Sequence, residues 1–156
     1  MGTGQAGADG ITRIVEVGAK PETEREAVAE CWITTSTEAV SNLVAGTKKG
    51  DPMESAKIAG VMGVKRTPDL LPHCHPIRVT GAEVVVEPDL DVGRIRVQTT
   101  VRATDRTGVE MEALTGAAAA ALSLYDTAKA FDRAARIDGL RLLSKSGGKS
   151  GDYRAE

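Results

Sequence analysis

The stretch RIRVQTTVRA, residues 94–103, decides the fold because two kinds of side chain alternate strictly along it. Successive side chains of a β-strand point to opposite faces of a sheet, so a period of two predicts a strand with one buried and one solvated face. The apolar set is Ile95, Val97, Thr99, Val101 and Ala103, and the polar set is Arg94, Arg96, Gln98, Thr100 and Arg102.

A second strand precedes this one, and we expect the two to form a β-hairpin over residues 77–103 with its turn at 88–93. Gly81 interrupts the alternation of the first strand, which predicts a bulge or bend there. Acidic side chains of this strand can form cross-strand ion pairs with the arginines, each worth about 0.5 kcal/mol. The alternating positions are Val84 and Val86 on one face and Glu83 and Glu87 on the other.

Two further strands are expected outside the hairpin. Residues 24–35 predict a strand, because their apolar side chains recur at a period of two, although a short helix fits this pattern almost as well. Residues 139–143 predict a last strand, after Gly139 interrupts a helical pattern. The shared face of the first of these strands consists of Ala27, Ala29, Cys31 and Ile33.

Three helices are expected between these strands. The first is predicted to end at Gly46 and the third near Ala135. Pro68 is predicted to break the second, and it can open a short extra turn through Leu71. The signals that begin them are Thr35 with Glu38, Asp51 with Pro52, and Thr107 with Glu110. The residues that share one face are Ile58, Val61, Met62 and Lys65 in the second helix and Leu114, Ala118, Ala121, Leu122, Tyr125 and Ala128 in the third.

The apolar face of the hairpin needs a cover, and the helices are the only candidates for it. We therefore predict an α+β fold, with an antiparallel or mixed sheet and the helices packed on one face. The length of 156 residues suits one domain. We place this domain at residues 11–156, after a polar, Gly-rich tail at 1–10 that we expect to be disordered.

Composition excludes several functional classes. The net charge is −2, and the chain has one Trp, two Tyr and one Phe, whereas a general nucleic-acid binder needs basic charge and stacking aromatics. Two cysteines cannot form a disulfide framework. No apolar run reaches the roughly 18 residues of a membrane helix, and the N-terminus lacks the apolar centre of a secretory signal. We expect a cytoplasmic protein.

Two basic segments are candidates for phosphate binding. The segment 144–152, SKSGGKSGD, ends like a P-loop, but that motif needs a glycine where Leu143 stands. A Gly-rich loop with two lysines can still offer N–H groups and charge to a polyphosphate. Lys48 and Lys49 directly precede a helix start, where anions are favoured. The alternatives are a solvated tail and a loop whose lysines keep the chain soluble.

The segment PHCHP, residues 72–76, contains the only two histidines of the chain, His73 and His75, with Cys74 between them. Histidines two residues apart lie on one side of an extended segment, but their spacing matches no standard zinc pattern. We therefore favour a polar contact to substrate or a structural role for these histidines over a metal site.

Two acidic clusters remain. Glu110 and Glu112 would point together on an extended chain but apart on a helix, where they could equally be two acids at the positive helix end. Asp126 and Lys129 share a helix face and could serve as an acid–base pair or as an ordinary surface ion pair.

The residues of several long sequence blocks, and the order of these blocks along the chain, indicate a family. The chain resembles the MoaC family of molybdenum-cofactor biosynthesis from about Ile14 to Arg154. Departures from the family pattern are His73 in place of a frequent Leu, Gly18 in place of Ser, and Thr127-Ala128 in place of Met-Cys. The blocks are AKPETEREAVAE at 19–30, KKGDP at 48–52, AKIAGVMGVKRTPDLLPHCHP at 56–76, TGVEMEALTGAAAAALSLYDTAKAFDR at 107–133 and LLSKSGGKSGDYR at 142–154.

The resemblance implies a ferredoxin-like α+β subunit in a homohexamer, built as a trimer of dimers with active sites at subunit interfaces. It also implies a lyase that converts 3′,8-cyclo-7,8-dihydroguanosine 5′-triphosphate to cyclic pyranopterin monophosphate and pyrophosphate. No metal or organic cofactor is implied. The partners implied are the nucleotide-derived substrate and further copies of the chain, with no nucleic acid and no membrane.

The family's functional residues match positions of this chain. Its catalytic Asp and Lys match Asp126 and Lys129, and the Lys of its KGD motif matches Lys49. The positions implied to contact substrate are Cys74, His75 and Pro76 of the CHP stretch, Glu110, Met111 and Glu112 of the acidic pair, Lys145 and Lys149 of the tail, and Arg25 of the REA motif, to which we add the neighbouring His73.

These matches suggest roles. Lys49, Lys145, Lys149 and Arg25 would neutralise a triphosphate, the Asp–Lys pair would transfer protons, and the acidic pair would bind the edge of the guanine-derived ring. Two rival interpretations are a paralogue that binds without turnover and another nucleotide-processing enzyme on the same scaffold.

Overall fold

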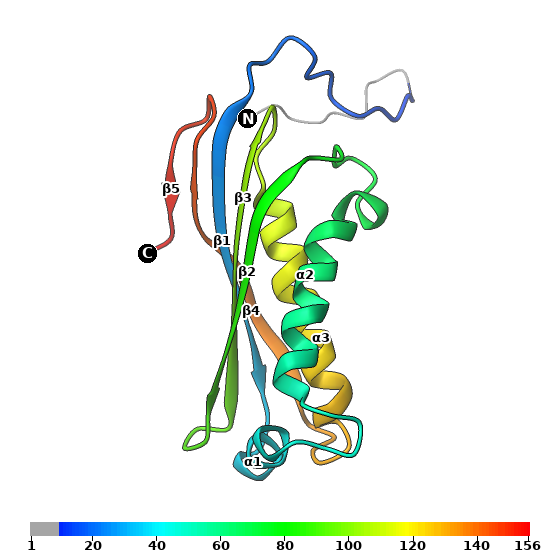
Figure 1. The fold of residues 1–156 in the computed structure, drawn as a ribbon, viewed down its shortest axis with the longest axis vertical. Helices are drawn as coiled ribbons and strands as arrows, with labels where there is room; N and C mark the ends of the chain where they lie inside the picture. Colours follow the sequence, from blue (N-terminus) through cyan, green and yellow to red (C-terminus); the bar gives the residue numbers. More distant parts are fainter. Residues whose placement is uncertain (1–9) are drawn as a thin grey trace.

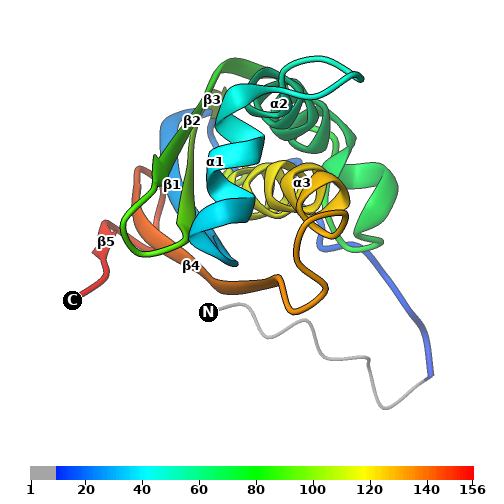
Figure 2. The ribbon, with the colours of Figure 1, turned by 90° about the horizontal axis from the view of Figure 1, so that it is seen from below.

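The computed structural model describes residues 10–156, so the predicted disordered tail lies outside the described residues except for Gly10. The elements form one antiparallel sheet in the order β2-β3-β1-β4-β5, with helices α2 and α3 on one face and α1 across one end (Figures 1 and 2). The predicted α+β arrangement is confirmed. The elements are β1 (Thr23–Thr34), α1 (Thr37–Ala45), α2 (Pro52–Leu70), β2 (Val79–Asp89), β3 (Arg94–Asp105), α3 (Glu110–Ala128), β4 (Arg136–Ser146) and β5 (Tyr153–Arg154).

The core lies between the sheet and the helices, on the face that the strand periodicity predicts. The strand predicted at residues 24–35 is confirmed as β1, and the predicted hairpin over residues 77–103 is confirmed as β2 and β3. A register shift between Val79 and Gly81 confirms the predicted irregularity in β2. Arg102 pairs with Glu83 at 2.9 Å and Arg96 with Glu87 at 3.3 Å on the opposite face, as predicted. The fully buried side chains of the two strands include Ala27, Ala29, Cys31, Ile33, Ile95, Val97, Thr99 and Val101.

Small residues allow α2 and α3 to lie close together. A Cβ added to Gly63 would lie 2.7 Å from the Cβ of Ala119, and one added to Gly116 would lie 2.7 Å from a methyl of Val64. Distances below 3.0 Å do not occur for real Cβ atoms, so both positions need glycine. The buried side of each helix is therefore made largely of alanine and glycine.

This small-residue packing corrects the predicted helix faces. Ile58 and Met62 of α2 are 61% and 56% exposed, and Leu122 of α3 is 58% exposed. These three large apolar side chains are exposed, because mostly small side chains fit between the two helices, whereas Val64 and Leu124 are buried in the core. The helical layer consequently has an apolar outer surface.

Three helix boundaries also differ from the predictions. Helix α1 is capped by Ser36, whose Oγ accepts from the Ala39 N–H at 3.0 Å, rather than by Thr35. Helix α2 continues past Pro68 to Leu70. The third helix begins after Val109 with no side-chain cap, so the predicted cap at Thr107 is wrong.

Helix α3 also ends earlier than predicted, at Ala128. The Asp132 carboxylate accepts hydrogen bonds from the Thr35 hydroxyl at 2.8 Å and from the Ser36 N–H at 3.0 Å. These contacts hold the chain against the start of α1 and direct it into β4. A contact across about a hundred residues of sequence cannot be seen in a local pattern.

The C-terminal segment is more ordered than predicted. Strand β4 extends to Ser146, beyond the predicted end at Leu143, and β5 returns beside it. The turn between them needs positive φ at Gly147 (88°) and Gly148 (82°), which L-residues with a side chain rarely adopt. Within the described part of the chain, the helices are too short or too polar to cross a membrane.

Candidate functional site

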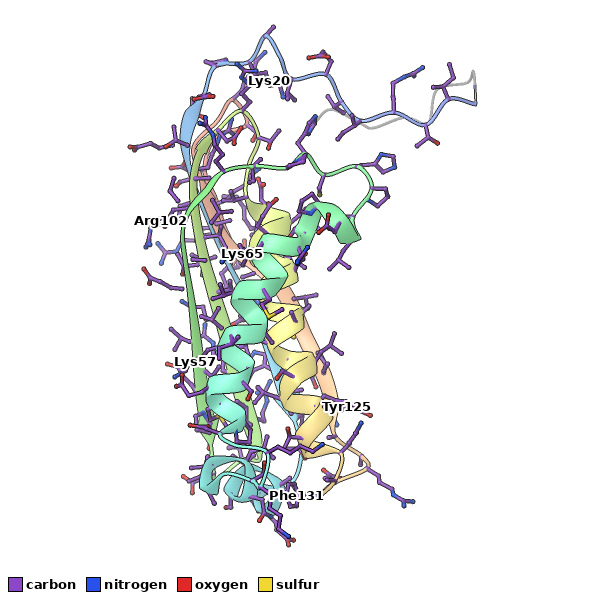
Figure 3. The ribbon with its side chains drawn as sticks, turned by 45° about the vertical axis from the view of Figure 1, so that its right-hand side comes forward. Lys20, Lys57, Lys65, Arg102, Tyr125 and Phe131 are labelled. Carbon is purple, nitrogen blue, oxygen red and sulfur yellow. The ribbon has the colours of Figure 1, made fainter. Side chains whose placement is uncertain are left out.

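The predicted site residues fall into two groups at opposite ends of the molecule. We call these the lower end, where α1 and the last turn of α3 lie, and the upper end, where β1 and α3 begin (Figure 1). Lys20 marks the upper end in Figure 3, and Tyr125 and Phe131 mark the lower end. Because α3 rises 1.5 Å per residue, Glu110 and Asp126 are about 24 Å apart along its axis.

The lower end holds an exposed acid–base cluster. Lys129 Nζ donates to Asp126 Oδ1 at 2.7 Å, so the predicted shared helix face is observed. This hydrogen bond and the charges of Lys129 and Lys49 hold the pKa of Asp126 below its usual range, and Asp126 raises the pKa of Lys129. Near neutral pH, Asp126 is therefore an ionised base and Lys129 a protonated acid.

Lys49 reaches this cluster from the turn between α1 and α2. Its backbone N–H donates to the Thr47 hydroxyl at 3.2 Å, and Thr47 and Gly50 form an isolated bridge that closes the turn. Asp51 then caps α2 by accepting from the Met53 N–H at 2.8 Å, as predicted. The turn thus presents Lys49 near Asp126, at the end of α3.

The upper end holds a large cleft of about 1140 Å³. Three segments form its walls, because the start of β1 and the ends of β3 and β4 lie at the same edge of an antiparallel sheet. Arg25, Lys145 and Lys149 all line it, so three predicted phosphate-binding residues are brought together. Its charged lining residues are Lys20, Arg25, Arg106, Glu110, Lys145 and Lys149.

Arg25 is held at the back of this cleft. Its guanidinium donates to the Arg106 carbonyl at 3.2 Å, and its Nε is buried without a partner. A Cβ added to Gly148 would overlap the Arg25 guanidinium, so the β4–β5 turn lies directly against Arg25 and a larger residue there would displace the guanidinium. The Gly-rich tail therefore shapes the cleft rather than hanging free in solvent.

Lys145 also lines the cleft and is already partnered. Its Nζ is 3.0 Å from Glu110 Oε1 and donates to the Ser150 hydroxyl at 3.2 Å. An anion entering the cleft would compete with Glu110 for this lysine. Lys149 is exposed in the same turn.

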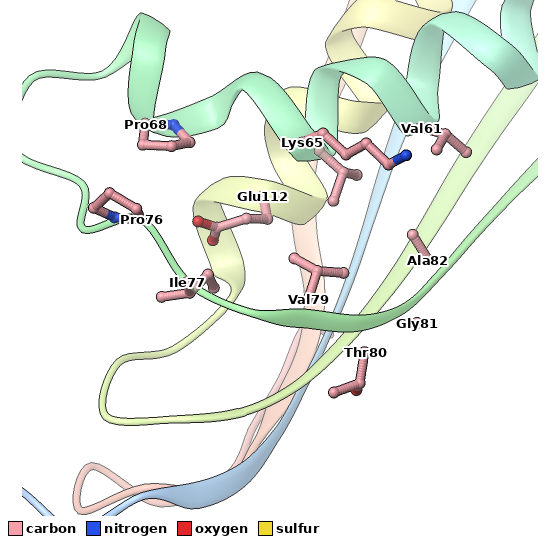
Figure 4. Close-up of a pocket in the computed structure, with 11 residues that line it drawn as sticks. Val61, Lys65, Pro68, Pro76, Ile77, Val79, Thr80, Gly81, Ala82 and Glu112 are labelled. Carbon is pink, nitrogen blue, oxygen red and sulfur yellow. The ribbon is translucent and has the colours of Figure 1, made fainter.

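Glu112 lies in a second pocket, of about 440 Å³, on the other side of the first turn of α3 (Figure 4). The side chains around it are mostly apolar, including Ile77 and Val79, and Lys65 lies at the rim. Glu112 is only 3% exposed. Burial raises its pKa to about 7, helped by the charges of Glu110 and Asp105 and opposed by a hydrogen bond from its own backbone N–H.

The acidic pair therefore diverges, as expected for a helix rather than an extended chain. Glu110 points to the cleft and Glu112 into the pocket, while Met111 between them is exposed. A ligand that bridges the two cavities could contact both carboxylates. Cys74 is close enough that the charge of Glu112 adds to burial in raising the pKa of its thiol.

The two histidines contact the N-terminal segment. His75 Nε2 lies 2.6 Å from the Val15 carbonyl oxygen, and His73 Nδ1 lies 3.3 Å from that of Arg13. A ring N–H donates in each contact. Among residues 10–156, no group of three or more His, Cys, Asp or Glu side chains could hold a metal ion.

Three cations at these cavities were missed by the sequence analysis: Lys20, Lys65 and Arg106. Lys20 and Lys65 lie within the sequence blocks that resemble the family, but no role was assigned to them, and Arg106 lies just before such a block. Only the sheet register, which brings residues far apart in sequence to one edge, places them beside the predicted residues.

Comparisons with known proteins show the family of this chain. The MoaC family model matches residues 14–148, and the chain belongs to the MoaC family. A cyclic pyranopterin monophosphate synthase of Brucella ovis is 47% identical over 145 residues, covering 92% of this chain and 88% of that protein.

Two further relatives carry the same name. The synthase of Parvibaculum lavamentivorans is 47% identical over 149 residues, covering 94% of this chain and 92% of that protein. That of a Roseiflexus species is 47% identical over 145 residues, covering 92% of each. The chain is thus an enzyme, a lyase of molybdenum-cofactor biosynthesis, and the resemblance found in the sequence is confirmed.

Proposed function

We propose that this protein, in the cytoplasm, converts 3′,8-cyclo-7,8-dihydroguanosine 5′-triphosphate to cyclic pyranopterin monophosphate and pyrophosphate. One observation carries the proposal. A chain of the MoaC family holds a base and an acid in contact, Asp126 and Lys129, with Lys49 close enough to lower the pKa of that base.

Proton transfer is assigned to the lower end. Opening the purine-derived ring and closing the pterin ring require protons to be removed from and returned to the substrate. Asp126, ionised near neutral pH, accepts a proton, and Lys129, protonated, donates one. After the first transfers, Asp126 carries a proton that it can donate, and Lys129 has lost one and can accept another. The two residues therefore exchange roles as the reaction proceeds.

The phosphate chemistry balances without a further reactant. A sugar hydroxyl attacks the α-phosphorus, one P–O bond forms, the bond to the β-phosphate oxygen breaks, and pyrophosphate leaves with the electron pair. The proton of the hydroxyl passes to a base. Lys49, Lys145 and Lys149 stabilise the negative charge on the leaving group.

The upper end binds the substrate. The Glu112 pocket accepts the guanine-derived ring, and Glu112 and Glu110 accept hydrogen bonds from its N–H groups. Contacts with the sugar and ring are assigned to four further residues on the family resemblance: Cys74, His75, His73 and Met111. None of the four lines the two cavities of a single chain, although Pro76, next to His75, lines the Glu112 pocket. Arg25 binds the triphosphate in the adjoining cleft.

One chain alone cannot bring these two ends to one substrate, because about 24 Å of α3 separates them, more than the length of an extended nucleotide. We infer that a second copy supplies the missing half. A two-fold axis across the outer surface of α2 and α3 would run the helices of two copies in opposite directions. The exposed Ile58, Met62 and Leu122 would then be buried between the copies. Three such dimers would form the proposed homohexamer.

The first experiment is to incubate the pure protein with the cyclised GTP intermediate and to assay both products. Equal amounts of cyclic pyranopterin monophosphate and pyrophosphate are expected, and plain GTP is expected to give neither. A folded protein that binds the intermediate but releases no product would contradict the proposal in favour of binding without turnover.

A second experiment tests the shared site. Asp126→Asn at the lower end and Arg25→Gln at the upper end are co-expressed, so that each hybrid dimer contains one intact site. About a quarter of the wild-type activity is expected in a random mixture of two-fold dimers, at low substrate concentration. The control mixes Asp126→Asn with Lys49→Ala, which lie at the same end and leave every site defective. Equal recovery in both mixtures, or none in either, would rule out a site built from two copies.

A further inference from the structure

The upper cleft carries more positive charge than the predicted residues account for. Five cations and one carboxylate line it, in a chain whose net charge is −2. Lys145 is paired with Glu110. Among residues 10–156, the other four cations form no ion pair. Unpaired like charges around one cavity repel each other, and an anion in the cavity relieves that repulsion.

Arg106 is placed by its backbone to face this cavity. It follows the last residue of β3, its N–H donates to the Asp105 carboxylate at 2.7 Å, and its carbonyl accepts from Arg25 at 3.2 Å. Its position is thus held on both sides, while its side chain lines the cleft and is exposed. The contact also ties the position of Arg106 to that of Arg25.

Lys20 reaches the same cavity from another segment. A turn before β1, closed by the Lys20 N–H donating to the Val17 carbonyl at 3.0 Å, brings it beside Pro21 in the cleft wall (Figure 3). Lys20 precedes Thr23 and Arg106 follows Asp105, and these two residues form the end pair of the antiparallel strands β1 and β3. Both cations therefore lie beyond the same end of the sheet.

We propose that Arg106 and Lys20 bind the phosphates of the substrate, completing with Arg25, Lys145 and Lys149 a site for a triphosphate group. The identity of this ligand rests on the proposed function. Five cations less one carboxylate leave four positive charges, which match the roughly four negative charges of a triphosphate near neutral pH. An arginine at position 106 adds a planar fork that can donate two hydrogen bonds to one phosphate.

The test uses inorganic tripolyphosphate as the probe, titrated calorimetrically into the full-length protein at low salt. Arg106→Gln and Lys20→Gln should each weaken binding about 10-fold, the loss expected for one charge-assisted contact. The matched control is Arg78→Gln. Arg78 lies at the same end, has a side chain 78% exposed and does not line the cleft.

Three outcomes would overturn the proposal: no binding of tripolyphosphate by the wild type, wild-type affinity in the two cleft variants, or an equal loss in Arg78→Gln. With the cyclised nucleotide as substrate, Arg106→Gln should raise KM about 10-fold and leave kcat within about 3-fold. If the wild type makes no product, the proposed function fails, while the tripolyphosphate titration still tests the cleft by itself.

Discussion

The two ends of the molecule differ in how they prepare charged groups for chemistry. At the lower end, Asp126 and Lys129 form an ion pair in open solvent, so the pKa of each is shifted by contact with the other, and the charge of Lys49 adds to the lowering for Asp126. At the upper end, Glu112 is buried, and its ionisation is set by loss of water. One helix connects the two environments. The comparison suggests that proton transfer and binding are separate tasks of separate ends.

The largest effect should come from Asp126→Asn, which keeps the shape of the side chain and removes the base. We expect kcat to fall by about 10² to 10⁴, the usual contribution of one acid–base group. Because the change is confined to the lower end, the affinity for tripolyphosphate should not change. Steady-state kinetics and calorimetry on one preparation check both statements, and wild-type turnover would remove Asp126 from the mechanism.

Glu112→Gln should reveal the cost of ionising a buried carboxylate. The pKa of Glu112 is raised to about 7 in the folded protein, so the folded state binds more protons than the unfolded state between about pH 4.5 and 7. The contribution of Glu112 to stability therefore falls as the pH rises through this window, by about 3 kcal/mol in all.

The Glu112→Gln variant lacks the pH-dependent contribution of Glu112 to the free energy of unfolding. Its stability relative to wild type should therefore rise from pH 4.5 to 8. Urea unfolding of both proteins at several pH values measures the difference. The difference cancels the contributions of Asp105 and Asp132, whose pKa values are lowered and which act in the opposite direction. A difference that is flat with pH would mean that Glu112 is not desolvated in the assembled protein.

The smallest effect expected is that of Gly148→Ala at the upper end. The added Cβ overlaps the Arg25 guanidinium, so Arg25 must move, and we expect tripolyphosphate to bind about 10-fold more weakly with kcat unchanged. Gly151→Ala is the matched control. Gly151 has a similar φ of 74°, but nothing lies within 4 Å of its added Cβ. Equal losses in the two variants would point to backbone strain instead of Arg25.

Local patterns predicted most of the fold. The alternation in residues 94–103 was enough to place β3 and its buried face, because a half-buried strand shows its burial in every second residue. The helix faces were predicted less well, because Ala and Gly form much of the buried contact and some large apolar residues, such as Leu122, face outward. Hydrophobic periodicity indicates which side is apolar but not what that side packs against.

The candidate site was predicted unevenly for the same reason. Asp126 and Lys129 are neighbours on one helix, so their spacing alone predicts their contact. Arg25 and Lys145 meet only because β1 and β4 are paired in one register. The sequence analysis assigned no role to Arg106 or Lys20, although Lys20 lies in the quoted block at 19–30.

The sequence by itself determined the strand and helix content, the MoaC family and the acid–base pair, since each depends on residues that are close in the chain or on blocks of residues in a fixed order. Only the tertiary structure decided that the proposed binding and acid–base groups lie at opposite ends, and which cations share the cleft. Those features depend on strand register and on the length of α3, and both are set by packing between segments that are distant in the chain.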